Sequence, residues 1–415
     1  MKAVILAIGD ELVLGQNVDT NSAWISARLV ERGIFSDYHK TVPDDQPAIA
    51  AAIREAAELA DMVIVTGGLG PTADDLTRQA LAEVMQAPLE LHAPSLEKMK
   101  GFFRKLGRPM PETNSIQAMC PHGAEILEND FGTAPGLKAR LGRATVLIFP
   151  GVPKEMKGMF GRHALPALPA ESGRTILTEV VNAFGAGEST VAEKLGDLMR
   201  RGRNPLVGTT VSGGVIAVRI RSDFATVERA RQALAETVQA VEERLGDLVF
   251  SRGAVTLPQV VGERLRQKGR SVVTVESCTG GLLAKLFTDV AGSSDYFRGG
   301  WVVYANDMKQ GQLQVPAAML DAHGAVSEQV ARTMAEQGLA AGRADYALAV
   351  TGVAGPGGGS AEKPVGTVWL ALAVRRGPDV QVQTERFSFP GDREMVRDRS
   401  AKMALDMLRL ELLRG

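Results

Sequence analysis

Residues 277–279 place a serine, a cysteine and a threonine side by side, and each of these side chains can act as a nucleophile. They follow the β-branched run 272–275 and precede Gly280 and Gly281, which open an apolar, helix-like stretch. We therefore expect a loop that leads from a strand into a helix. The amides of the two glycines are placed there to hold an oxyanion or a phosphate. The alternative is a strand-to-helix turn without chemistry.

A serine nucleophile needs a base, and no histidine stands near this loop in the sequence. Residues 293–309 supply other candidates, because an aromatic, Gly-Gly-containing strand is followed there by Tyr304 and Lys309. A lysine whose pKa is depressed by burial can accept the proton, and Tyr304 would orient the reacting group or stack on a ring. The competing interpretation is a core tyrosine and an exposed lysine, which is the commoner situation.

Two later segments are rich in groups that bind substrates. Residues 351–369 form a glycine-rich loop between strands, which predicts either a flexible surface loop or a wrap around a substrate. Arg393, Arg397 and Arg399 stand at the start of the expected last helix, with Asp392 as its N-cap. Arginine binds phosphate through its planar fork, although three solvated surface arginines would give the same pattern.

A different pattern, "TGGLGPTADDLT", occupies residues 66–77. Glycines after a strand let the backbone approach a ligand with its N–H groups outward, so this segment predicts a phosphate cradle. Asp74 and Asp75 stand where a helix is expected to start, and two carboxylates beside a phosphate imply a divalent cation between them. The alternative is capping, with Thr72 and Asp75 as a T-x-x-D box.

Another glycine-bounded turn, residues 9–21, carries Asp10, Glu11 and Asp19 after the first expected strand. In an open parallel sheet, the loops at the carboxyl ends of neighbouring strands meet in one crevice. We therefore expect these acids to approach Asp74 and Asp75. Taken singly, each acid is better explained as a helix cap or a solvated charge.

The elements that must position these loops indicate three domains. Buried β-branched strands that alternate with helices predict an α/β domain with a parallel sheet over residues 1–170. Residues 171–253 combine a strand of alternating apolar and polar side chains with an amphipathic helix, and predict a small α+β connecting or dimerisation domain. Residues 254–415 form a second α/β domain that ends in a long helix.

The composition argues for a small, discrete substrate. Lys plus Arg (47) and Asp plus Glu (48) nearly cancel, so we expect no attraction to nucleic acid or to a membrane surface. No apolar run approaches membrane-spanning length, and the apolar run at the start is too short for a signal peptide. Two distant cysteines fit a reducing cytoplasm, and five scattered histidines argue against zinc.

The first domain resembles the amino-terminal domain of the competence/damage-inducible protein CinA family, which is similar to molybdopterin-binding domains. The resemblance rests on four segments in order, "GDELVLGQNVDTNSAWIS", "TGGLGPTADDLTRQAL", "NDFGTAPG" and "FPGVPKEM". It implies an ADP-ribose pyrophosphatase that forms AMP and ribose 5-phosphate, with a divalent metal ion (Mg, Mn or Co) and potassium (K) as a further ion. The site residues that it implies are the metal ligands Asp10, Glu11, Asp74 and Asp75, and the substrate-binding residues Asn21, Gly68, Gly70 and Gly151, the last in the loop Pro150–Pro153.

The last domain resembles the CinA carboxy-terminal domain in "ESCTGG", "GGWVVYAND", "TGVAGPGGGSAEKPVGTVW" and "FPGDR". This resemblance implies a deamidase, without a metal, that converts nicotinamide mononucleotide to nicotinate mononucleotide and ammonia. We expect Ser277 to be the nucleophile and Cys278 to be the alternative, although a cysteine at a strand end is more often a packing residue. The other site residues that we expect are the catalytic Thr279, Tyr304 and Lys309, and the substrate-binding Gly280, Gly281, Gly355, Gly357, Arg393 and Arg399.

The sequence therefore predicts two α/β/α domains, molybdopterin-binding-like and CinA carboxy-terminal, joined by a small α+β domain. The predicted function is a homodimeric hydrolase of pyridine-nucleotide salvage in the cytoplasm. Two alternatives stay open. One is a molybdenum-cofactor biosynthesis protein, and the other is a non-catalytic nucleotide-binding protein of competence or the DNA-damage response.

Overall fold

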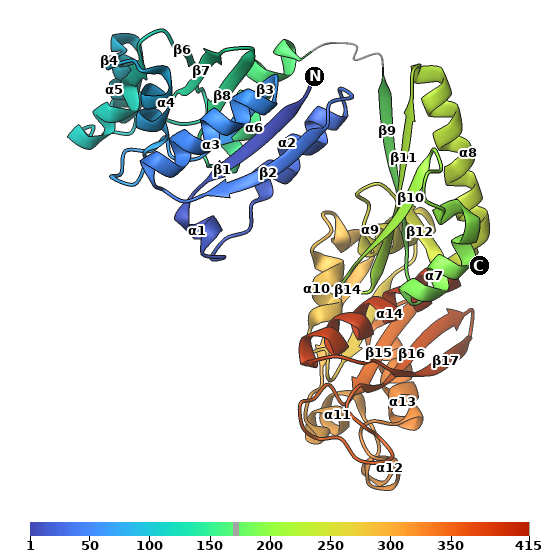
Figure 1. The fold of residues 1–415 in the computed structure, drawn as a ribbon. Coiled ribbons are helices and arrows are strands. Elements are labelled where there is room, and N and C mark those ends of the chain that lie inside the picture. The colour runs from blue at the N-terminus through green and yellow to red at the C-terminus, as the bar shows by residue number, and fades with distance from the viewer. Residues whose placement is uncertain (169–173, 415) are drawn as a thin grey trace. The chain divides into compact units, whose positions relative to one another are not determined.

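The structure is a computed structural model that describes residues 1–168 and 174–414 (Figure 1). It contains two compact units, Met1–Leu177 with Asp223–Arg231, and Thr178–Ser222 with Gln232–Gly415. The domain boundary that the sequence predicts between residues 170 and 171 lies outside the described residues. Within the described ranges, no helix has the length and apolar character needed to cross a membrane.

The first unit contains an α/β/α domain. Its elements are β1 (Ala3–Ile8), α1 (Asp10–Val13), α2 (Thr20–Val30), β2 (Ser36–Val42), α3 (Gln46–Leu59), β3 (Met62–Thr66), α4 (Thr77–Met85), β4 (Leu89–Leu91), α5 (Ala93–Lys105), the 3-10 helix η1 (Glu112–Ala118), β5 (Met119–Pro121), β6 (Glu125–Leu127), β7 (Gly136–Leu141), β8 (Ala144–Phe149) and α6 (Pro153–Met159). The main sheet has the strand order β2-β1-β3-β8-β7-β6. Alternate side chains of its central strands pack against α3 and α4 on one face and against α2 and α6 on the other. Burial on both faces explains why these strands are continuous apolar runs.

Part of this sheet differs from the predicted parallel arrangement. The strands β2, β1, β3 and β8 are parallel, whereas β7 pairs with β8 and β6 pairs with β7 in antiparallel orientation. The reason is a tight turn between β7 and β8, where Gly142 has a φ of 55°. Such a short connection joins antiparallel neighbours, because a parallel pair needs a long crossover.

The α+β module and the second α/β/α domain follow along the chain. The elements in order are β9 (Thr175–Ala183), α7 (Glu188–Leu195), β10 (Leu206–Ser212), β11 (Val215–Phe224), α8 (Val227–Leu245), β12 (Val249–Arg252), α9 (Leu257–Gln267), β13 (Val272–Glu276), α10 (Leu282–Thr288), β14 (Phe297–Val302), α11 (Asn306–Leu313), α12 (Ala317–His323), α13 (Glu328–Gly342), β15 (Tyr346–Gly352), β16 (Thr367–Arg376), β17 (Asp379–Ser388) and α14 (Arg393–Arg414). The first few of these strands form a sheet of order β10-β11-β9-β12 whose apolar face packs against α7 and α8. The predicted α+β character of this module is confirmed.

The last domain is built on a sheet of order β14-β13-β15-β16-β17, in which β14, β13 and β15 are parallel. One face packs against α9, α10 and α14, and the other against α13 with α11 and α12 (Figure 1). The terminal helix begins at Arg393 as predicted, and the Asp392 carboxylate accepts the amide N–H of Met395 at 2.9 Å. The predicted N-cap is thereby confirmed.

Candidate functional site

Ser277 stands at the carboxyl end of β13, in the middle of the parallel strands of the last domain. Its amide donates to the carbonyl of Val350 at 2.9 Å, and the preceding carbonyl, of Glu276, accepts the amide of Val303 at 2.8 Å. The backbone on both sides of the nucleophile position is thus held by its two neighbouring strands. The Ser277 side chain is 8% exposed, so the hydroxyl lies at the edge of the core.

Lys309 is brought to this hydroxyl from the first turns of α11. Its Nζ atom lies 3.3 Å from Ser277 Oγ, 2.9 Å from the Val303 carbonyl and 3.0 Å from the Tyr304 carbonyl. The side chain is 1% exposed, and this burial lowers the pKa of Lys309. A neutral amine has two N–H groups and one lone pair. If the two carbonyls take the N–H groups, the lone pair is left for the Ser277 hydroxyl proton.

Cys278 is a poor nucleophile in this environment. Its side chain is 4% exposed, and burial raises the pKa of the thiol to about 12. The thiolate is the reactive form, and at neutral pH very little of it would be present. The side chain belongs to the apolar cluster that fills one face of the sheet. These observations favour the packing interpretation.

Thr279 presents a free hydroxyl beside the nucleophile loop. Its Oγ1 atom is buried and has no hydrogen-bond partner in the described part of the chain. The carbonyl of the same residue accepts from Nη2 of Arg397 at 2.8 Å. A buried hydroxyl without a partner is costly, so this one is available to donate to a substrate atom.

Arg393 contacts both Tyr304 and the glycine-rich loop. Nη2 of Arg393 donates to the Tyr304 hydroxyl at 3.1 Å, and Nη1 donates to the Gly355 carbonyl at 2.7 Å. Tyr304 is 58% exposed, so its side chain lies at the surface rather than in the core. Arg399 is not brought to this group, because its Nη1 donates to the Pro390 carbonyl at 3.2 Å. A Cβ atom at Gly357 would meet nothing within 4 Å, so this glycine is set in open space.

The amides of Gly280 and Gly281 do not form the predicted anion site. The Gly280 amide donates to the Ser277 carbonyl at 3.1 Å, and the Gly281 amide donates to a carboxylate oxygen of Glu276 at 3.0 Å. The prediction that these two amides bind a substrate anion is therefore wrong. The physical reason is that the chain supplies its own acceptors to both donors.

In the first domain, a hollow of about 280 Å³ opens at the carboxyl ends of β1, β3 and β8. The side-chain amide of Asn21 spans it, donating to Thr66 Oγ1 at 3.1 Å and to the Gly151 carbonyl at 2.7 Å. Its Oδ1 atom is buried without a partner among the residues described. The structure thus brings Asn21 and Gly151 together, and it leaves the Asn21 Oδ1 acceptor uncommitted.

The glycine turn after β3 is anchored by its carbonyl groups. Thr77 donates to the Gly67 carbonyl through Oγ1 at 3.0 Å and to the Gly68 carbonyl through its amide at 3.2 Å. The next carbonyl, of Leu69, accepts from Arg78 at 3.1 Å and from Gln117 at 3.4 Å. In a trans peptide the N–H points opposite to the C=O, so the amides of Gly68 and Leu69 face the other way. This is the amide geometry of a phosphate cradle.

Arg78 is a buried cation beneath this cradle. It is 1% exposed, and its Nε and Nη1 atoms have no partner in the described chain. Burial lowers the pKa of Arg78 to about 10, which keeps the guanidinium charged at neutral pH. A positive charge under outward-facing amides favours an anionic ligand.

Asp75 is used by the protein itself. Its carboxylate accepts the Gly70 amide at 2.7 Å, the Thr72 amide at 2.9 Å and the Thr72 hydroxyl. The contact between Thr72 and Asp75 exists as the capping alternative predicts. However, α4 begins at Thr77, so this contact closes the turn before the helix rather than capping it. With its donors already supplied, Asp75 is a poorer metal ligand than the sequence predicts.

The remaining acids gather around a residue that the sequence analysis did not single out, Asp44. Asp44 and Asp10 accept each other's amide N–H groups at 2.9 and 3.1 Å. Burial raises the pKa of Asp44, and the neighbouring carboxylates of Asp10, Glu11 and Asp74 raise it further. Asp10, Glu11 and Asp74 thus all lie near Asp44, and a direct approach of Asp10 and Glu11 to Asp74 stays a prediction. Over residues 1–168 and 174–414, however, no three acidic, histidine or cysteine side chains are close enough to hold a metal ion.

Comparisons with known proteins agree over the whole length. Three protein-family models match, namely the probable molybdopterin binding domain over residues 4–170, the damage-inducible protein CinA KH domain over 178–251 and the CinA C-terminal domain over 254–412. A CinA-like protein of Anaeromyxobacter sp. (strain Fw109-5) is 44% identical over 408 residues, 98% of each chain. A CinA-like protein of Geobacter sulfurreducens is 42% identical over 415 residues, 100% of each chain. This chain belongs to the CinA family.

Solved structures of CinA superfamily proteins are similar to part of this chain. One is the crystal structure of a CinA superfamily protein from Klebsiella pneumoniae, at 36% identity and a TM-score of 0.37, covering 38% of this chain and 97% of that chain. The family models confirm the predicted fold, with a molybdopterin-binding-like domain, a small KH-like module and a CinA C-terminal domain. Family and fold are consistent with an enzyme.

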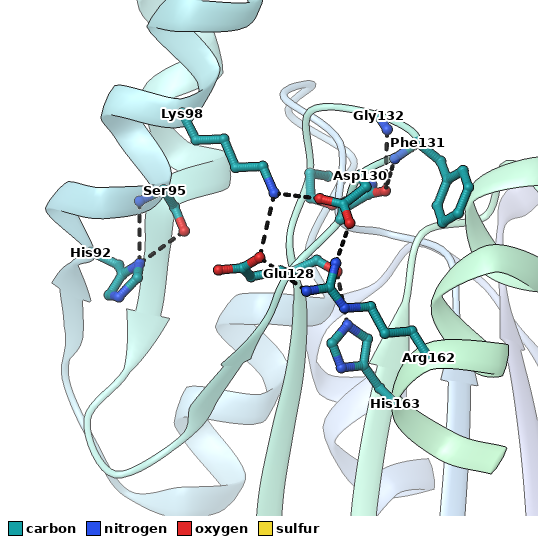
Figure 2. A network of polar contacts seen from close by, with 11 residues as sticks. His92, Ser95, Lys98, Glu128, Asp130, Phe131, Gly132, Arg162 and His163 are labelled. Atoms are coloured by element: carbon teal, nitrogen blue, oxygen red, sulfur yellow. Dashed lines mark hydrogen bonds and ion pairs between the residues drawn. The ribbon is translucent and has the colours of Figure 1, made fainter. Parts of the chain in front are cut away.

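A larger hollow in the molybdopterin-binding-like domain of this CinA-family chain, about 820 Å³, lies between α5 and the loop 128–135. Figure 2 shows that the charged side chains beside it are paired with one another. Lys98 contacts Asp130 at 2.8 Å and Glu128 at 3.7 Å, and Arg162 contacts both acids as well. Because these four charges are paired with one another, they are not free to select a ligand.

Proposed function

We propose that the CinA C-terminal domain is an amidase that converts nicotinamide mononucleotide to nicotinate mononucleotide and ammonia. The observation that carries the proposal is the contact between Ser277 and the buried amine of Lys309. A serine and a neutral lysine are a sufficient nucleophile and base for acyl transfer from an amide. The resemblance to the CinA family suggests the substrate.

The proposed reaction has two steps. In the first, Ser277 Oγ attacks the carboxamide carbon while Lys309 takes the hydroxyl proton and passes it to the departing nitrogen, which leaves as ammonia. The free hydroxyl of Thr279 is suited to donate to the oxyanion that forms on the carboxamide oxygen. In the second, Lys309 deprotonates a water that attacks the acyl-serine carbon, and the Ser277 oxygen leaves with the proton. The acid product and the free enzyme result.

The test is ammonia release from nicotinamide mononucleotide by the full chain and by two variants, Ser277→Ala and Cys278→Ala. We expect loss in Ser277→Ala and near-normal release in Cys278→Ala. Loss in Cys278→Ala alone would move the nucleophile by one residue. No release by the wild-type chain would contradict the proposal and favour the non-catalytic alternative in competence or DNA damage.

We further propose that the molybdopterin-binding-like domain hydrolyses ADP-ribose to AMP and ribose 5-phosphate. The supporting observation is the cradle, in which carbonyls are anchored inward above the buried Arg78. The amides of Gly68 and Leu69 would bind a phosphate of the pyrophosphate group, and Asn21 Oδ1 would accept from a hydroxyl of the ligand. An unpartnered acceptor and free amides suit a sugar phosphate.

The acids near the cradle suit a divalent ion such as Mg, Mn or Co in type. Magnesium is commonly held by one or two carboxylates together with substrate phosphates rather than by a protein cage. This agrees with the lack of a ready three-ligand group in the described residues. One or two of the carboxylates of Asp10, Glu11 and Asp74, together with the substrate phosphates, would hold the ion, which would neutralise pyrophosphate charge when bound.

The full chain incubated with ADP-ribose tests this second activity. We expect AMP to appear with magnesium and to stop when a chelator removes the metal. No AMP under any divalent metal would favour the alternative of molybdenum-cofactor biosynthesis. Ser277→Ala serves as the control, because it should leave AMP release unchanged.

A further inference from the structure

Glu276 is a buried carboxylate that the reaction above does not use. It is 0% exposed and directly precedes Ser277. Its Oε2 atom accepts the amides of Gly281 and Leu283, each at 3.0 Å, and its Oε1 atom accepts the amide of Ala284 at 2.8 Å. Both carboxylate oxygens are therefore committed to the first turn of α10.

The strand geometry explains how the side chain arrives there. Successive side chains of a strand point to opposite faces of the sheet. Val272 packs on the face covered by α9, α10 and α14, and Glu276, four residues later, points to the same face. Val273 and Val275 pack on the other face, the side from which α11 presents Lys309.

The glycines let the chain return to the carboxylate. Gly280 and Gly281 have φ values of 59° and 92°, in the left-handed region that other residues rarely adopt. This turn directs the amides of Gly281, Leu283 and Ala284 back toward the strand end. Hydrogen bonds to a charged acceptor are stronger than those between neutral groups, so the turn is fixed in one conformation.

The backbone of Glu276 extends the same control to the base. Its carbonyl accepts the Val303 amide at 2.8 Å, and the Val303 carbonyl in turn accepts from Lys309 Nζ at 2.9 Å. Glu276 is thus connected to Ser277 by a peptide bond, to α10 by its side chain and to Lys309 through Val303.

We infer that Glu276 is a positioning residue of the amidase. Its carboxylate accepts amides at the start of α10 and so holds the Ser277 turn in the position in which the hydroxyl contacts Lys309. It touches neither substrate nor base. The inference rests on the proposed amidase activity. It also accounts for the Gly281 amide, which donates to Glu276 and is therefore not available to a substrate anion.

The test compares ammonia release by Glu276→Gln, Glu276→Ala and Asp289→Ala in the full chain. Asp289→Ala is the matched control, because it removes an exposed carboxylate from the same loop-helix segment, paired with Lys285. A small error in placing reacting groups is enough to cost about 100-fold in rate. We expect kcat to fall roughly 10- to 100-fold in Glu276→Gln with KM changed less than about threefold, and no change in Asp289→Ala.

Three further measurements separate positioning from loss of the fold or direct chemistry. The acid limb of the pH profile of Glu276→Gln should stay in place, because Lys309 is still the base. Formate should restore part of the kcat of Glu276→Ala, since a small carboxylate can accept the freed amides, and chloride at equal ionic strength should not. Melting curves report the folded fraction. If Glu276→Ala does not fold, Glu276→Gln decides.

The outcomes are distinguishable from failure of the proposed function. A wild-type chain that releases no ammonia removes the amidase proposal itself. An active wild type with an equally active Glu276→Gln overturns only the positioning role. A folded Glu276→Ala that has lost activity, and that formate does not restore, overturns it as well.

Discussion

Two glycine turns follow buried parallel strands in the two α/β/α domains, and they are anchored in opposite ways. After β3, the carbonyls of residues 67–69 are tied inward, and the buried cation Arg78 lies beneath them. After β13, the amides at the start of α10 are tied inward by the buried anion Glu276. Both turns read as Gly-Gly after a β-branched strand, yet one leaves donors facing outward and the other uses them up.

The difference follows from the peptide group, which carries its donor and its acceptor on opposite sides. Anchoring the carbonyls frees the amides for an anionic ligand, whereas anchoring the amides excludes one. The first turn is therefore suited to binding phosphate, and the second to holding a nucleophile still. The predictions below test whether these two designs are separate in function.

The largest effect is expected from removing the base of the second turn. Lys309→Met should lower ammonia release at least about 1,000-fold, because Ser277 would lose its proton acceptor. Release of AMP from ADP-ribose by the same protein should be unchanged. Both products are measured on one preparation, so that loss of the fold is recognised.

Lys285→Met is the control for this change, since Lys285 is an exposed lysine of α10 that pairs with Asp289. Normal ammonia release by Lys309→Met would remove Lys309 from the mechanism. A parallel loss of AMP release in a protein that melts as the wild type does would show that the two sites are not independent.

The pH dependence should also separate the two turns. Burial lowers the pKa of Lys309, and the base acts in its neutral form, so ammonia release should rise with pH through that lowered pKa and then level off. Below it, the rate should fall about tenfold per pH unit as the amine is protonated. The measurement is kcat/KM for nicotinamide mononucleotide against pH, and a rate that increases toward acid would contradict Lys309 as the base.

Removing the cation under the first turn should affect only that turn. Arg78→Met keeps the volume but withdraws the charge and the main donor to the Leu69 carbonyl. We expect KM for ADP-ribose to rise about tenfold, with ammonia release unchanged. Arg54→Met, at an exposed arginine of α3, is the control. An unchanged KM in Arg78→Met would show that the cradle does not depend on the buried charge.

The sequence predicts the loops of both sites because strand ends and glycines are visible in it. It also places Ser277, Thr279, Tyr304 and Lys309 in one domain, and the structure brings Lys309 Nζ to the Ser277 hydroxyl and to the Tyr304 carbonyl. What it does not reveal is which buried group meets each backbone donor. The Gly281 amide was assigned to a substrate, although its acceptor, Glu276, stands five residues earlier in the chain.

Some signals for the missed residues are present in the sequence. Glu276 is a charged residue at the end of an otherwise apolar strand, and such a position requires a buried partner. Asp44 follows β2, a neighbour of β1, so the rule that loops converge at strand ends applies to it as it does to Asp10. Arg78 gives no such signal. It is the second residue of α4, where an arginine is ordinary in the sequence, and only the packing reveals that it is buried.

The smallest effects come from adding one methyl group to each turn. Gly68 has a φ of 66°, and a Cβ there would lie 2.1 Å from Thr77 Oγ1, which already holds the Gly67 carbonyl. Gly68→Ala should therefore lower the stability of its domain by about 3 kcal/mol, from backbone strain plus overpacking.

Gly280 has a similar φ of 59°, but the nearest atom to an added Cβ is Nη2 of Arg397 at 3.6 Å, an ordinary contact. Gly280→Ala should cost only the backbone term, about 1 kcal/mol. Calorimetric melting of the full chain measures the loss of stability in each variant. Loss of AMP release on heating reports unfolding of the first α/β/α domain, and loss of ammonia release reports unfolding of the second. Equal losses of stability in the two variants would mean that the space available to the added methyl group has no influence. A larger loss of stability in Gly280→Ala would mean that the second turn, which is fixed by Glu276, adjusts less readily than the first turn, which is anchored through its neutral carbonyls.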